Sequence, residues 1–72
     1  MTVGEYIRTK REVAGVTIAE VARACDVTTQ AVYHWENITG GRKPSARKLY
    51  ALAQVIDLKP SEVVELVKLA AS

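Results

Sequence analysis

The chain has 72 residues, of which 49% are hydrophobic and 25% charged, so it has room for one hydrophobic core and one domain over residues 1–72. Its net charge of +2 is too small to indicate a nucleic-acid partner unless the cations are clustered, and its lone cysteine, Cys25, excludes an internal disulfide. Because the sequence also lacks zinc-ligand spacing, a membrane-length apolar run and a signal-peptide pattern, we expect a soluble, intracellular protein without metal or cofactor.

The first helix is predicted over about residues 3–14. Thr2 and Glu5 have the spacing of a capping box, in which a hydroxyl and a carboxylate satisfy the free amide groups of a helix start. Gly15 can adopt the left-handed conformation that ends a helix. The stripe expected to face the core consists of Val3, Tyr6, Ile7, Val13 and Ala14, and the residues expected to face outward are Arg8, Arg11 and Glu12.

A second, short helix is predicted over residues 18–25, because Thr17 and Glu20 repeat the capping-box spacing. Asp26 tolerates the left-handed region of backbone conformation and is expected to end this helix. The buried face is predicted to consist of Ile18, Val21, Ala22 and Cys25.

A third helix is predicted over about residues 29–37, with Thr28 as its cap. Val32 and Trp35 are spaced to face inward, which makes the tryptophan a core residue and not a base-stacking one. The opposite side of the helix is polar and rich in hydrogen-bonding groups, and it consists of Thr29, Gln30, Tyr33 and His34.

Residues 38–44 have the composition of a loop, and two more helices are predicted after it. Ser45 can cap the fourth helix, which should stop near Asp57, and residues 59–62 begin the last one. The fourth helix has the apolar residues Leu49, Leu52, Ala53, Val55 and Ile56, and the fifth has the stripe Val63, Leu66, Val67 and Ala70. Val64 and Leu69 lie off that stripe, which leaves fraying, extra core contact and a dimer surface as alternatives.

Positive charge is concentrated in one stretch of the chain. Residues 38–50 contain no acid and four cations, namely Arg42, Lys43, Arg47 and Lys48. Because this stretch directly follows the third helix, we interpret its cations as anchors for DNA phosphates.

Two short helices joined by a tight turn, over about residues 17–37, have the layout of a helix-turn-helix, whose second helix enters the DNA major groove. The chain resembles the lambda-type Cro and phage-repressor helix-turn-helix family over residues 4–67. The resemblance is carried by VTIAEVARACDVTTQAVYHWEN at residues 16–37 and by RKPS at residues 42–45. It implies an all-α, five-helix, lambda-repressor-like domain that binds double-stranded operator DNA as a homodimer and regulates transcription.

Carried onto this sequence, the resemblance places the base-contacting positions on Thr29, Gln30 and His34. The amide of Gln30 suits adenine, because it can bond N6 and N7 together. Histidine changes its charge near neutral pH, so a DNA contact by His34 would make binding pH-dependent. Contacts to the DNA backbone are expected from Thr17, Thr28, Tyr33, Asn37, Arg42, Lys43, Ser45 and Arg47.

The sequence departs from the family pattern at three places. Ile18 stands where the family usually has a glutamine that contacts phosphate and braces the recognition helix. Asp26 replaces the usual turn glycine, and residues 38–41 lengthen the following loop by about two residues. The first departure removes that polar clamp, the second places a negative charge near the motif, and the longer loop indicates rearranged backbone contacts.

An antitoxin or a protein-binding adaptor of the same fold is the alternative function, favoured by the modest net charge and by Ile18. An enzyme is not predicted, because His34 has no nucleophile and acid arranged with it, and no small-molecule ligand is expected. Because the sequence given ends just after the fifth helix, a Cro-like phage or prophage repressor is preferred to a signal-responsive one. We expect such a protein to act in the cytoplasm of a bacterial or phage-infected cell, in association with the nucleoid.

Overall fold

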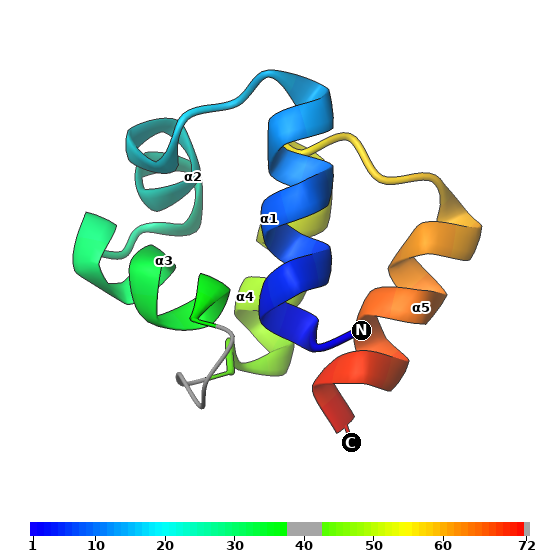
Figure 1. Ribbon diagram of the computed structural model, residues 1–72. Helices are drawn as coiled ribbons and strands as arrows, with labels where there is room; N and C mark the ends of the chain where they lie inside the picture. Colours follow the sequence, from blue (N-terminus) through cyan, green and yellow to red (C-terminus); the bar gives the residue numbers. More distant parts are fainter. Residues whose placement is uncertain (38–42, 72) are drawn as a thin grey trace.

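The computed structural model describes residues 1–37 and 43–71, and these residues form five α-helices and no strand. The helices are α1 Val3–Ala14, α2 Ile18–Cys25, α3 Thr29–Glu36, α4 Ala46–Val55 and α5 Pro60–Ala71. In Figure 1, α1 runs through the middle, with α2 and α3 on one side, α5 on the other and α4 partly behind it. The predicted all-α, five-helix fold is therefore confirmed. Among the described residues, none of the helices combines the length and the hydrophobicity of a membrane span.

The helix starts follow the local capping pattern. At the start of α1, the backbone N–H of Thr2 donates to Glu5 Oε1 at 3.0 Å, and the N–H of Glu5 donates to Thr2 Oγ1 at 3.2 Å. Thr17 and Glu20 form the same box at the start of α2. Gly15 ends α1 in the left-handed conformation, with φ of 69°. The predicted starts of α1 and α2 and the predicted end of α1 are therefore confirmed. They were predictable because each depends only on residues a few positions apart.

The core receives a fully buried side chain from every helix. These side chains are Ile7, Val21, Val32, Leu52 and Leu66, each 0% exposed. Cys25 and Trp35, which are 2% and 6% exposed, belong to the same cluster, so their predicted inward placement is confirmed. Burial of an aliphatic side chain contributes about 1.5–3 kcal/mol, and this cluster therefore holds α2 and α3 against the other helices.

The predicted stripe of α1 is wrong in its last turn. Val13 is 81% exposed and Ala14 is exposed, whereas the side chain of Arg11, predicted to face outward, is only 13% exposed. The physical reason is the helical period of 3.6 residues, which places Arg11 one turn after Ile7 on the same face and Val13 on another side.

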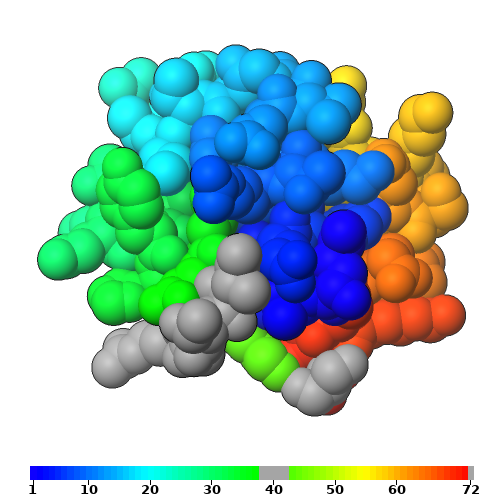
Figure 2. Space-filling model, in the orientation of Figure 1, coloured from blue at the N-terminus to red at the C-terminus, as the bar shows by residue number. Residues whose placement is uncertain are grey.

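In Figure 2, α1 fills the centre of the visible face, between α3 at one edge and α5 at the other.

The C-terminal helices differ from the prediction in smaller ways. α4 ends at Val55, and Asp57 then takes the left-handed conformation with φ of 55°. In α5, Leu66, Val63 and Ala70 of the predicted stripe lie in or against the core, whereas Val67 is 40% exposed. Leu69 packs partly buried against the core, which is the extra core contact among its alternatives. The buried face of α5 is centred on Leu66, so a residue three positions later shares that face and the next residue in the chain does not.

Candidate nucleic-acid interface

The turn between α2 and α3 is closed by its backbone. Asp26 has φ of 57°, and its N–H donates to the carbonyl of Arg23 at 3.3 Å. The N–H of Val27 donates to the carbonyl of Ala22 at 2.9 Å. Ala22 is 4% exposed, and its small side chain lets the two helices cross closely. Asp26 can close this turn because aspartate, with its short polar side chain, tolerates the left-handed region.

One side of α3 presents polar groups to solvent. Thr29, Gln30, Tyr33 and His34 are all exposed, whereas Val32 and Trp35 on the other side lie in the core. The three predicted base-contacting residues therefore share one accessible face. Thr28 is exposed as well, but its Oγ1 accepts a hydrogen bond from the N–H of Ala31 at 3.2 Å and caps the helix.

A shallow groove of about 440 Å³ runs between α3 and the segment that precedes α4. Its lining residues are Val27, Thr28, Gln30, Ala31, His34, Trp35 and Lys43. The groove brings Gln30 and His34, two predicted base-contacting residues, beside Lys43, a predicted phosphate contact. Groups suited to a base edge and a group suited to a phosphate thus line one hollow of the surface.

The other predicted backbone contacts are spread around this groove. Ser45 is exposed and caps α4, since its Oγ accepts from the N–H of Lys48 at 3.4 Å, and Arg47 is exposed in the first turn of α4. Thr17 is exposed at the start of α2, where its hydroxyl is engaged with Glu20. Asn37 is exposed just after α3, and Arg42 lies outside the described residues.

Lys48 is partly buried, unlike the exposed Lys43 and Arg47 of the same stretch. Its Nζ donates to the backbone carbonyl of Cys25, the last residue of α2, at 2.7 Å. Burial raises the pKa of the Cys25 thiol, and the nearby Lys48 ammonium opposes that rise. In this structure the ammonium of Lys48, interpreted above as a phosphate anchor, is therefore engaged within the protein.

An ion pair that sequence reasoning missed supports the far end of α3. Nε of Arg11 contacts Oε2 of Glu36 at 2.7 Å, Nη2 donates to Oε1 at 3.2 Å, and Nη1 donates to the carbonyl of Val16 at 3.0 Å. The hydrogen bond with Glu36 raises the pKa of Arg11. The available signal was the helical spacing of Arg11 from Ile7, which places a cation on an otherwise apolar face.

Gly4 supplies a second support at the same place. A β-carbon at Gly4 would lie 2.9 Å from the carbonyl oxygen of Trp35 and 3.1 Å from that of Asn37. The first turn of α1 therefore touches the backbone at the end of α3. A glycine inside the predicted first helix was the sequence signal for this close approach.

A family model described as helix-turn-helix matches residues 7–63, which covers all of α2, α3 and α4. No curated protein and no solved structure matches the chain. The matched segment contains the turn, the polar face of α3 and the groove beside it.

Proposed function

The chain belongs to the lambda Cro and repressor helix-turn-helix family, whose members bind DNA, and on this premise we propose that it is a sequence-specific repressor of transcription. The observation that carries the proposal is the groove in which Gln30 and His34 of α3 lie beside Lys43. A surface that reads DNA needs side chains for base edges and cations for phosphates within reach of the same duplex.

In this proposal α3 is the recognition helix and lies in the major groove. Gln30 bonds an adenine edge, Thr29 offers its methyl or hydroxyl to a neighbouring base, and His34 contacts a base or a phosphate. Backbone contacts come from the side chains that surround this face, which are Thr17, Thr28, Tyr33, Asn37, Arg42, Lys43, Ser45 and Arg47. We further propose that the protein is of phage or prophage origin and acts on operator DNA in the bacterial cytoplasm.

Two copies are proposed to bind together, because one small domain reaches few base pairs. The described chain measures 25 × 24 × 21 Å, whereas half-sites one helical turn apart are separated by about 34 Å. One copy is therefore too small to reach both half-sites, and a second copy is needed to place a recognition helix at the other one.

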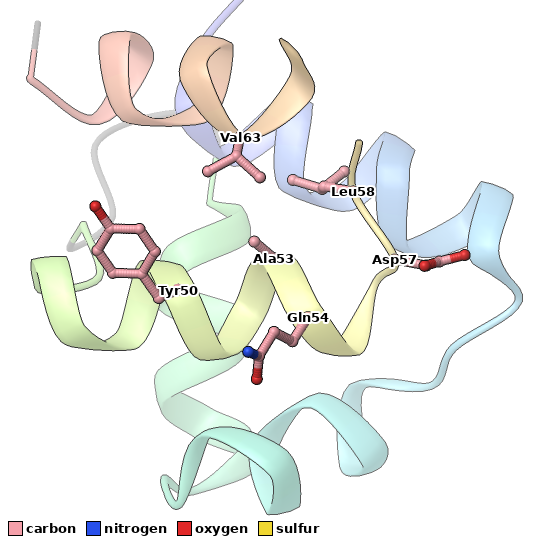
Figure 3. Close-up of a pocket in the computed structure, with 6 residues that line it drawn as sticks. All are labelled: Tyr50, Ala53, Gln54, Asp57, Leu58 and Val63. Atoms are coloured by element: carbon pink, nitrogen blue, oxygen red, sulfur yellow. The ribbon is translucent and has the colours of Figure 1, made fainter. Parts of the chain in front are cut away.

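We propose that the pairing surface lies across α4 and α5. Tyr50 is 62% exposed and lines a groove of about 360 Å³ between the two helices, and Val64 and Val67 of α5 are 53% and 40% exposed. Figure 3 shows Tyr50 projecting from α4 and Val63 pointing from α5 toward α4 at this groove. Arg47, a proposed phosphate contact, lies one turn before Tyr50 on α4, so the apolar surface begins beside the DNA-facing side.

The proposal is tested by selecting sites from a random DNA library with the purified protein and titrating the best site. Enrichment of a palindrome is expected, and Gln30→Ala should weaken discrimination at one base pair by about 1–3 kcal/mol. Gln54→Ala is the matched control on a single half-site, where pairing plays no part. Gln54 is also exposed but lines the groove between α4 and α5, so base discrimination should not change. The Tyr50→Ser variant should bind a half-site normally and lose affinity for the full palindrome.

A protein-binding role, as in an antitoxin or adaptor, is the second candidate, and the exposed Tyr33 on α3 favours it. It predicts that no DNA sequence is enriched and that any binding disappears at moderate salt without regard to sequence. That result would overturn the repressor proposal.

A further inference from the structure

Lys48 joins two parts of the protein that surround the proposed DNA-reading face. Its Nζ donates to the carbonyl of Cys25 at the end of α2, and its backbone N–H donates to Oγ of Ser45 at the start of α4. One residue thus contacts both the cap of α4 and the last residue before the helix-turn-helix turn.

The carbonyl that Lys48 contacts is one that α2 does not satisfy itself, because the last four carbonyls of a helix have no partner within it. The carbonyls of Ala22 and Arg23 accept hydrogen bonds from the amides of Val27 and Asp26 in the turn. That of Cys25 accepts from Lys48 instead. A cation at this end of α2 also interacts favourably with the helix dipole.

The apolar contacts between α2 and α4 are not directional. Cys25, Leu49 and Leu52 are buried in the shared core, and such packing resists separation more than it resists small sliding movements. A hydrogen bond depends on distance and angle, so the bond from Lys48 opposes sliding of α4 along the end of α2.

We propose that Lys48 is a positioning residue for DNA binding: it holds Lys43, Ser45 and Arg47 at a set distance from the reading face of α3. The inference rests on the proposed function. Lys48 itself contacts protein and not phosphate, and it acts through the anchors that flank it. The positioning affects the groove beside α3, because Lys43 lines that groove together with Gln30 and His34.

Two variants separate the hydrogen bond from the bulk of the side chain. Lys48→Met keeps a long, helix-compatible side chain and removes the donor, and Lys48→Arg keeps a donor. We expect Lys48→Met to weaken binding to the selected operator about tenfold, and Lys48→Arg to restore most of it. Lys59→Met is the control, because Lys59 is an exposed lysine just before α5. The operator affinity of this variant should equal that of the wild type.

A double-variant comparison shows whether Lys48 acts through Arg47. If it does, Lys48→Met combined with Arg47→Gln loses less affinity than the product of the two separate losses. If the two losses of affinity instead multiply, and Lys48→Met lowers the slope of log affinity against log salt by about one, Lys48 is itself a phosphate contact. That result would overturn the proposal. A lowered Tm with unchanged affinity of the folded protein would make its role purely structural, which also overturns it.

The free protein provides a readout that does not need an operator. Lys48→Met should increase the backbone mobility of residues 45–47 measured by NMR relaxation, while residues 29–34 of α3 stay ordered. Unchanged mobility would overturn the positioning role even if operator binding is found. Increased mobility without any selected operator would instead overturn the proposed repressor function and leave the coupling in place.

Discussion

Arg11 and Glu36, which are 25 residues apart in sequence, form a two-bond ion pair that ties α1 to the last residue of α3. Their side chains are only 13% and 7% exposed. Because Arg11 also donates to the carbonyl of Val16, the same guanidinium contacts the segment that leads into α2. Both helices of the helix-turn-helix unit are therefore held by one cation on α1.

The first prediction concerns this pair. Arg11→Met leaves the Glu36 carboxylate buried without its partner, and we expect a loss of about 3–5 kcal/mol in the free energy of unfolding, measured with urea. Arg11→Met combined with Glu36→Met should recover a large part of that loss, because no unpaired charge remains. A loss under about 1 kcal/mol for the single variant would show that the pair behaves like an exposed one.

A second prediction concerns close packing at Gly4. Gly4→Ala places a β-carbon 2.9 Å from the carbonyl oxygen of Trp35 in α3, so α1 must shift. We expect the free energy of unfolding, measured by thermal unfolding, to fall by about 1–3 kcal/mol. Gly15→Ala is the comparison, since it meets no atom within 4 Å and has only its positive φ to accommodate. Its cost should be about 1–2 kcal/mol, and operator affinity should fall only for Gly4→Ala. Equal operator affinity in both variants would contradict a role for Gly4 in placing α3.

Acid stability is predicted to depend on the contact between α1 and α5. The hydrogen bond from Lys10, at 2.5 Å, and the backbone N–H of Lys59 lower the pKa of Glu62 from its usual value of 4.5. A lowered folded-state pKa means that this carboxylate stabilises the fold above its unfolded-state pKa, and that the contribution is lost as pH falls through the lowered value. Chemical unfolding between pH 6 and about pH 3 should therefore show a smaller decline for Glu62→Gln than for the wild type. A parallel decline in both proteins would assign the acid sensitivity to other groups.

The last prediction concerns Lys43 in the groove beside α3. Lys43→Gln should weaken operator and unrelated DNA alike and lower the slope of log affinity against log salt by about one, because one phosphate contact is lost. Lys59→Gln, at an exposed position before α5, should leave the slope unchanged. If Lys43→Gln alters base preference and not the slope, Lys43 contacts bases and the assignment of roles around the groove is wrong.

Much of the helical pattern was predictable because it depends on near neighbours. The two capping boxes involve residues three positions apart, and Gly15 and Asp26 end their helices through their own backbone conformations. The polar side of α3 also followed from spacing alone, since Val32 and Trp35 had to face the core. The helix-turn-helix and its exposed reading face were therefore accessible from the sequence.

The partners of the charged side chains were not accessible in this way. Arg11 was predicted to face outward and Lys48 to face DNA, yet one pairs with Glu36 and the other bonds Cys25, 25 and 23 residues away. Local patterns extend over about four residues of a helix, and they cannot show which side chains meet when helices pack. By itself, the sequence determined the five helices and the face that α3 presents. Only tertiary packing decided which cations support that face from within, because those contacts form when α1 and α4 are brought against α2 and α3.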